Sequence, residues 1–330
     1  MPLNQRDFPV PSIAAIALGL AGIALVSDFI LQGPSAGGRG RRHVLLPPVL
    51  RTAPFTEPAT VTAARRLNRA AGTLAASVFA DSAIEHYRGS FKNKAMLTPL
   101  IVSALSIATS IHGTADRRPL AHIARDAGYA LAAVTGLIGT GFHVYNVGKR
   151  VGRFSWQNLF YGAPLGAPFA ILLSGLIGFC SERVRDTSRW RTPTIFRLPA
   201  GRTMAAVIGA GLLGTTAEAG LLHFRGAFHN PLMLLPVTLP PIGALLMGSA
   251  AGGPPGRNLF LTRWFMRLLT AMGFGGSALH AYGVSRNMGG WRNWSQNVLN
   301  GPPIPAPPSF AGLALAGLAA LALMDDHPDA

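Results

Sequence analysis

Long runs of apolar residues, separated by short polar segments, follow one another along the chain. A helix needs roughly 20 such residues to cross the hydrocarbon core of a bilayer, and nine runs are long enough. The predicted spans are residues 11–32, 68–87, 96–113, 126–147, 164–181, 202–223, 232–250, 262–282 and 308–324. The pattern therefore predicts an all-α fold, a polytopic transmembrane helical bundle.

Polar residues between these runs recur at a constant distance of 137 residues. The pairs are Asp81 with Glu218, His86 with His223, Arg88 with Arg225, Asn93 with Asn230, and His143 with His280. After a two-residue insertion, the correspondence continues from Pro164 to Pro303. Each copy contains two helical hairpins, so the copies share one orientation. We therefore expect two tandem four-helix repeats related by a pseudo-two-fold axis along the membrane normal.

The repeat divides the chain into four parts. These are an N-terminal transmembrane anchor with an Arg-rich loop (1–59), the first repeat (60–182), an Arg-rich cytoplasmic linker (183–199), and the second repeat with a short acidic tail (200–330). The apolar run in the first part is longer than the roughly 7 to 15 apolar residues of a signal peptide. We expect it to be retained as an anchor.

The duplicated histidines, the loops after them and the N-terminus share one predicted membrane face. That face carries about a third of the 29 Lys and Arg residues, and the positive-inside rule places the richer face in the cytoplasm. We therefore expect a multi-pass protein of the bacterial inner membrane, with the N-terminus outside and the C-terminus cytoplasmic.

Composition agrees with a lipid environment, since 49% of the residues are hydrophobic and only 13% are charged. The net charge of +16 lies mostly in loops between the spans, where topology accounts for it. Nucleic-acid binding is therefore not expected. The single cysteine, Cys180, excludes an iron–sulfur cluster or a cysteine-ligated zinc site within this chain alone.

Small residues precede three of the four duplicated histidines on the same helix face. Before His143 and His280 these positions hold only Gly, Ser or Thr, whereas Phe79 interrupts the corresponding face below His86. Such stripes indicate close helix contacts in membranes, so the imidazoles should point into the bundle. Asp81 and Glu218 lie deeper on the same helices, where a carboxylate is costly and suggests function.

These residues suggest a quinone site near the outer face. In this hypothesis the cofactor-binding residues are His86, His143, His223, His280, Asn93 and Asn230, which hydrogen-bond the quinone carbonyls. Asp81 and Glu218 relay protons, and Arg88 and Arg225 stabilise a reduced anion. In a variant, histidine pairs ligate haem b. No other metal site is expected.

Such a protein would be a membrane subunit of an electron-transfer complex, with partner subunits at the outer face. Two four-helix bundles plus one helix resemble, in layout alone, the quinone-binding membrane subunits of the polysulfide-reductase type. A proton-coupled transporter with two rocking halves is one alternative. A scaffold or assembly factor that docks a periplasmic partner is another. The histidines also fit a structural role as donors to backbone carbonyls, with the asparagines as helix caps.

Overall fold

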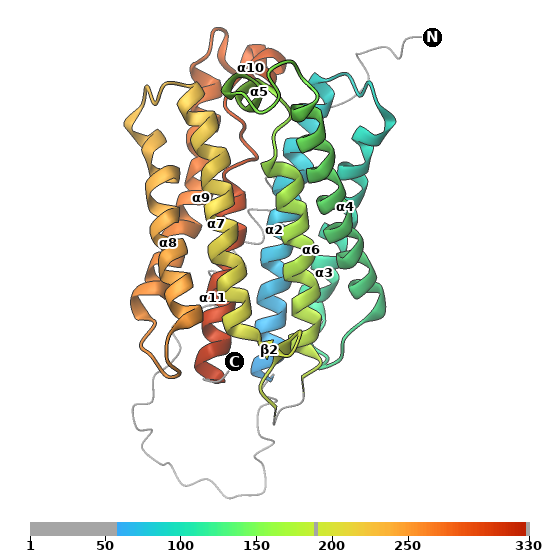
Figure 1. Ribbon diagram of the computed structural model, residues 1–330, viewed down its shortest axis with the longest axis vertical. Coiled ribbons are helices and arrows are strands. Elements are labelled where there is room, and N and C mark those ends of the chain that lie inside the picture. Colours follow the sequence, from blue (N-terminus) through green and yellow to red (C-terminus); the bar gives the residue numbers. More distant parts are fainter. Residues whose placement is uncertain (1–57, 188–190, 328–330) are drawn as a thin grey trace, which may run out of the picture.

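The computed structural model describes residues 58–187 and 191–327, and this part of the chain is nearly all helical (Figure 1). The predicted span at residues 11–32 lies outside the described residues.

The first half consists of four long helices, one short helix and one 3₁₀ turn. They are α2 (Ala59–Arg88), η2 (Lys94–Leu97), α3 (Thr98–Ala115), α4 (Ile123–Gly148), α5 (Trp156–Tyr161) and α6 (Gly166–Arg185).

A small antiparallel hairpin joins the halves, and the second half then repeats the order of elements, with one further 3₁₀ turn. The elements are β1 (Thr194–Ile195), β2 (Leu198–Pro199), α7 (Ala200–Arg225), η3 (Pro231–Leu234), α8 (Leu235–Gly252), α9 (Phe260–Arg286), η4 (Gly290–Asn293), α10 (Trp294–Asn300) and α11 (Pro308–Asp326).

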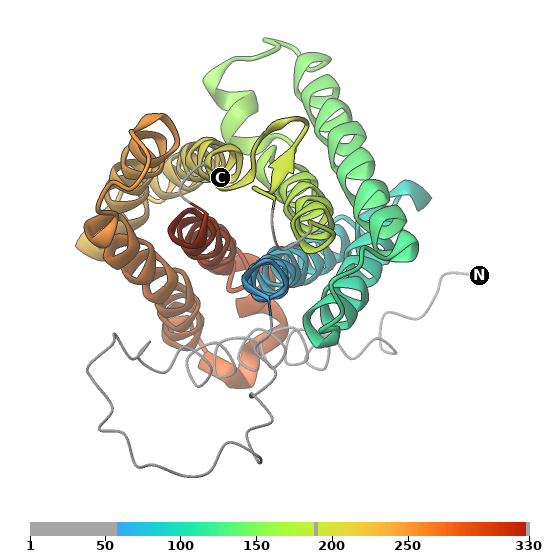
Figure 2. The same cartoon turned by 90° about the horizontal axis from the view of Figure 1, so that it is seen from below.

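The long helices form two adjoining groups. In each group the helices follow one another around a ring, α2, α3, α4 and α6 in the first and α7, α8, α9 and α11 in the second. Helices α2 and α11 pack side by side at the centre, where the groups meet (Figure 2). The short helices α5 and α10 lie at one end of the bundle, and the β-hairpin lies at the other (Figure 1). We call the end with α5 and α10 the histidine end, because the four duplicated histidines lie near it, and the end with the β-hairpin the C-terminal end.

Six of the described helices are long and apolar enough to cross a membrane, namely α3, α4, α6, α7, α8 and α11, with the 3₁₀ turns leading into α3 and α8 included. The protein is thus a membrane-embedded helical bundle. The helices predicted as spans at 68–87 and 262–282 are α2 and α9, which are not among the six. Arginines in the N-terminal parts of these two helices, including Arg65, Arg69 and Arg263, lower their apolar character.

Prolines and glycines account for helix starts and helix contacts. Pro99 and Pro236 stand in the first turns of α3 and α8, where a missing N–H costs no hydrogen bond. Gly136 lets α4 approach α6 so closely that a Cβ atom there would lie 2.3 Å from the backbone nitrogen of Leu172. Its counterpart Gly273 brings α9 against α11 in the same way. The close contacts predicted from the small-residue stripes are confirmed at these two positions.

Candidate functional site

The four duplicated histidines all lie near the histidine end, on α2, α4, α7 and α9. Each ring contacts, through Nδ1, a backbone carbonyl oxygen in the segment that opens the next long helix. The pairs are His86 with Met96 (2.5 Å), His223 with Met233 (2.8 Å), His280 with Pro303 (2.8 Å), and His143 with Pro164. The carbonyl partners correspond between the repeats, so the same local contact is made twice in each half.

These contacts determine where each imidazole carries its proton. A carbonyl oxygen can only accept a hydrogen bond, so Nδ1 must be the donor. A neutral imidazole then has a free lone pair on Nε2, which is the form that binds metal. Within the described residues, none of the four Nε2 atoms makes a hydrogen bond. The hydrogen bonds from Nδ1 to backbone carbonyls are therefore those expected of structural histidines. They leave Nε2, the nitrogen that could bind a metal, without a hydrogen bond in the described part of the chain.

In the second half, the rings of His223 and His280 contact each other edge-on. Helices α7 and α9 lie on opposite sides of their ring, and both pack against α8 and α11 (Figure 2). The ring centres of His223 and His280 are 6.3 Å apart, with an angle of 64° between the ring planes. An imidazole nitrogen binds a transition metal at about 2 Å, so two imidazoles on opposite sides of one metal have centres roughly 6 Å apart.

The duplicated arginines contact the opposite half of the molecule. Arg88 donates to the carbonyl oxygen of Leu299 in α10 at 3.1 Å, and Arg225 donates to that of Phe160 in α5 at 3.3 Å. Leu299 and Phe160 are equivalent positions in the two repeats, so the two contacts are reciprocal. Arg88 is also paired with Glu85 at 2.5 Å. The arginines thus connect the two halves near the histidine end.

The duplicated acids lie where the two halves meet. Glu218 abuts the start of α6, since a Cβ atom on Gly166 would be 2.8 Å from the Glu218 Cγ atom. The N-terminus of a helix is a favourable place for a carboxylate. Asp81 has no such arrangement, because the counterpart of Gly166 is Pro305, which lacks an N–H group. Asp81 instead lies within electrostatic range of Glu218, Glu85 and Arg88.

The duplicated asparagines cap the 3₁₀ turns that lead into α3 and α8. Asn93 accepts from the backbone N–H of Ala95 and Asn230 from that of Leu232, both at 3.0 Å. Each follows a pair of non-glycine residues with positive φ at matching positions. Capping accounts for both asparagines, as the structural interpretation predicted.

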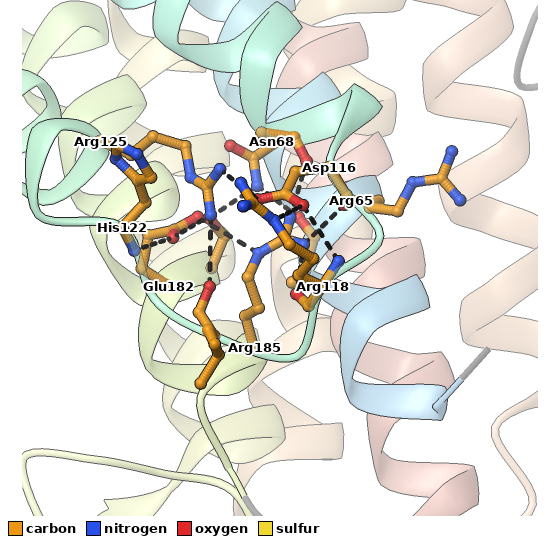
Figure 3. A network of polar contacts seen from close by, with 12 residues as sticks. Arg65, Asn68, Asp116, Arg118, His122, Arg125, Glu182 and Arg185 are labelled. Carbon is orange, nitrogen blue, oxygen red and sulfur yellow. Dashed lines mark hydrogen bonds and ion pairs between the residues drawn. The ribbon is translucent and has the colours of Figure 1, made fainter.

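A second polar cluster, which the sequence reasoning missed, lies near the C-terminal end of the first half (Figure 3). We call it the buried network. It comprises Asn68 on α2, Ser110 on α3, Asp116 after α3, Arg125 and Tyr129 on α4, and Ser181, Glu182 and Arg185 on α6. Their side chains connect all four long helices of this half.

Charged groups at the centre of the buried network are removed from solvent. The side chains of Arg125, Glu182 and Arg185 are 1%, 0% and 0% exposed. Arg125 contacts Glu182 and Asp116, each at 2.8 Å. Arg185 donates to the carbonyl oxygens of Gly113 and Asp116, both at 2.7 Å. Two arginines and two carboxylates therefore balance one another in the core.

The remaining polar atoms of the buried network extend this arrangement. The Tyr129 hydroxyl contacts Asn68 Oδ1 at 2.5 Å and Ser110 Oγ at 3.1 Å. Burial alone would raise the pKa of the Asp116 carboxyl, but hydrogen bonds from Arg118 and Arg125 outweigh burial and hold this pKa well below its usual range. Asp116 is therefore ionised throughout the physiological pH range.

The second half has no counterpart of the buried network. At the positions equivalent to Asn68, Ser110, Arg125, Tyr129, Glu182 and Arg185 stand Ala205, Met247, Thr262, Met266, Leu321 and Met324. Thus the repeats share the histidines but differ at the opposite end. The charges were missed because Arg125 and Glu182 stand just outside the apolar runs, where they read as loop charges. A position-by-position comparison of the repeats was the signal that could have found them.

The described residues contain no group of three or more His, Cys, Asp and Glu side chains arranged to hold a metal ion. Comparisons with protein-family models, curated proteins and solved structures give no match to this chain. The resemblance in layout to quinone-binding membrane subunits therefore stays a prediction.

Proposed function

We propose that this chain is the membrane subunit of an electron-transfer oxidoreductase that exchanges electrons with quinone, and that a histidine pair in the bundle holds a b-type haem. The observation that carries the proposal is the imidazole arrangement at the histidine end. Each Nδ1–H is engaged by a backbone carbonyl, and no residue of the described ranges forms a hydrogen bond with any of the four Nε2 atoms. Backbone hydrogen bonds of this kind orient the histidine ligands of metal sites.

Haem ligation is favoured over direct binding of quinone by the duplicated histidines, asparagines, arginines and acids, because most of these residues already have structural contacts. Asn93 and Asn230 are used as caps, and Arg88 and Arg225 have backbone partners in the opposite half. Glu218 is placed against a helix start. In the described part of the chain, the imidazole Nε2 atoms are the duplicated polar atoms of this set for which neither repeat shows a hydrogen-bond partner. In this proposal quinone is the lipid-soluble reactant, and the protein-bound redox group is the haem.

The finer architecture is part of the same proposal. We place the chain in a bacterial inner membrane with nine spans, the histidine end and N-terminus outside, and the C-terminus in the cytoplasm. The two halves are taken to be related by a pseudo-two-fold axis along the membrane normal. The reciprocal contacts of Arg88 and Arg225 support this relation, because a two-fold axis pairs equivalent patches of both partners.

A partner subunit follows from the chemistry of the chain. Cys180 is the single cysteine, and it is 7% exposed inside the bundle. This chain therefore supplies no iron–sulfur cluster of its own. A redox centre on a separate subunit, docked at the histidine end, would complete the electron path.

The visible spectrum of the purified protein, with any subunits that copurify, tests this proposal. The dithionite-reduced minus air-oxidised spectrum should show the bands of a b-type haem. A water-soluble quinone added to the reduced protein should then restore the oxidised spectrum. A protein that shows no haem bands, and yields no quinone on extraction with organic solvent, would contradict the proposal.

A further inference from the structure

We infer that the second half binds an anionic phospholipid at the C-terminal end of the bundle, through the guanidinium groups of Arg257 and Arg267. Arg267 lies on α9 and Arg257 on the loop between α8 and α9, at the end opposite the duplicated histidines (Figure 1). This site goes beyond the function proposed above and does not depend on it, because it shares no residue with the histidine end.

The arginines of α4 and α6 at this end of the first half have acidic partners. Arg125 and Arg185 both contact Glu182, at 2.8 and 3.5 Å, and Arg183 is paired with Asp126. Their positive charge is thus neutralised within the protein. These arginines therefore have little charge left for a ligand outside the chain.

The equivalent part of the second half has the opposite charge pattern. Asp126, Ala127 and Ala130 of α4 correspond to Arg263, Trp264 and Arg267 of α9. Arg263 pairs with Asp325 at the end of α11, at 2.6 Å. Arg267 is exposed, and no residue of the ranges 58–187 and 191–327 forms a hydrogen bond or an ion pair with it. The charge of Arg267 is therefore available to a ligand outside the chain.

The length of α9 places Arg267 near the lipid headgroups. The helix has 27 residues, which span roughly 40 Å, whereas the hydrocarbon core is about 30 Å thick. Arg267 stands two turns from the first residue of the helix, about 10 Å along its axis. Leu261, Trp264 and Leu268 are exposed around it. Tryptophan is typical of the membrane interface, and a long arginine side chain keeps its charged end at that level.

A cavity of about 220 Å³ lies at the same end of the second half. The residues that line it include Arg257, Met324 and Asp325. Because Asp325 is also the partner of Arg263, the cavity adjoins the first turns of α9. Arg257 is exposed and donates to the hydroxyl of Ser249 at 2.6 Å. Serine carries no charge, so this contact orients the guanidinium without neutralising it.

The balance of charge favours an anionic lipid as the occupant. Arg257, Arg263 and Arg267 outnumber Asp325 and Asp326, the acids at this end of the described second half. A guanidinium group binds phosphate through two parallel hydrogen bonds. A zwitterionic headgroup also carries a cation, which the arginines would repel. Basic pockets on the cytoplasmic side of membranes bind anionic headgroups, and that is the side proposed above for this end.

Lipid retention by the full-length protein tests the inference. Native mass spectrometry of protein supplied with equal amounts of phosphatidylglycerol and phosphatidylcholine gives the ratio of the two bound lipids. We expect phosphatidylglycerol to be preferred roughly 30-fold, since two arginines near anionic lipid contribute about fivefold each. Arg257→Gln and Arg267→Gln should each lower the ratio about fivefold, and the double variant should remove the preference.

Arg292→Gln is the matched control, because Arg292 is an exposed arginine at the histidine end, and it should keep the full preference. Equal retention of the two lipids by the wild type, or a preference that persists in the double variant, would overturn the inference. Displacement of the lipid by excess inorganic phosphate would also overturn it, in favour of a site for free phosphate. Size-exclusion elution and helical circular dichroism of every variant separate loss of the site from loss of the fold.

Discussion

Glu182→Gln is expected to destabilise the bundle by roughly 3–5 kcal/mol, because removal of one member of a buried ion pair leaves its partners as uncompensated charges. Glu182 is fully buried and contacts Arg125 at 2.8 Å and Arg185 at 3.5 Å. With a neutral amide at this position, two arginines would remain in the core against the single carboxylate of Asp116. The free energy of unfolding, from titration with SDS in mixed micelles followed by circular dichroism, measures the effect.

The second half supplies the matched comparison for this variant. It fills the equivalent positions with Thr262, Leu321 and Met324. The triple variant Arg125→Thr, Glu182→Leu and Arg185→Met removes three of the four charges of the buried network and leaves Asp116 paired with Arg118. Replacement of a buried ion group by uncharged residues of similar volume is often close to neutral. We expect the triple variant to be more stable than Glu182→Gln alone. A single variant as stable as the wild type, or a triple variant that is the less stable of the two, would contradict this account of the buried network.

Gly136→Ala is expected to destabilise the protein by about 1–3 kcal/mol or more, as overpacking of a tight contact does. The added methyl group would lie 2.3 Å from a backbone nitrogen of α6, and a backbone atom cannot move aside as a flexible side chain can. Gly273→Ala should behave alike, since a Cβ atom there would lie 2.6 Å from the backbone nitrogen of Ala311. The same SDS titration measures both variants.

Each of these glycines has a control on its own helix. Gly141 on α4 and Gly275 on α9 have no atom within 4 Å of an added Cβ. Alanine is the better helix former by about 0.8–1 kcal/mol in a helix interior, so Gly141→Ala and Gly275→Ala should be neutral or slightly stabilising. Equal effects of Gly136→Ala and Gly141→Ala would show that α4 and α6 do not meet closely at Gly136.

Much of the fold follows from patterns that depend only on local sequence. Apolar runs predicted the helices, and small residues before His143 and His280 predicted close contacts at Gly136 and Gly273. The prolines in the first turns of α3 and α8 are likewise a local feature of the sequence. Asn93 and Asn230 were assigned to the quinone carbonyls, with helix capping as the alternative, and both are found as helix caps.

Other features depend on how distant helices pack, and local patterns do not contain that information. The reach of Arg88 into α10 and of Arg225 into α5 follows from the arrangement of the two halves. Similarly, Asn68 and Ser181 stand 113 positions apart and form a hydrogen bond only when α2 and α6 pack. Glu182 and Arg125 each look like an ordinary charge at the end of a span until a partner is placed opposite.

The roles assigned to the acids and arginines from the sequence remain predictions. Their contacts are structural ones, which is why the proposal rests on the imidazoles. Asp81 is the exception, because no hydrogen bond holds its carboxylate in the described part of the chain and a proline stands where its counterpart Glu218 meets a helix start.

The most direct test of the central claim is the electron paramagnetic resonance spectrum of the oxidised, full-length protein. Two imidazole ligands on one ferric haem give a low-spin signal, so we predict such a signal in the wild type and in His229→Ala. In His280→Ala it should be lost or replaced by a high-spin signal. A wild-type protein without a ferric haem signal, or a low-spin signal that persists unchanged in His280→Ala, would contradict the account.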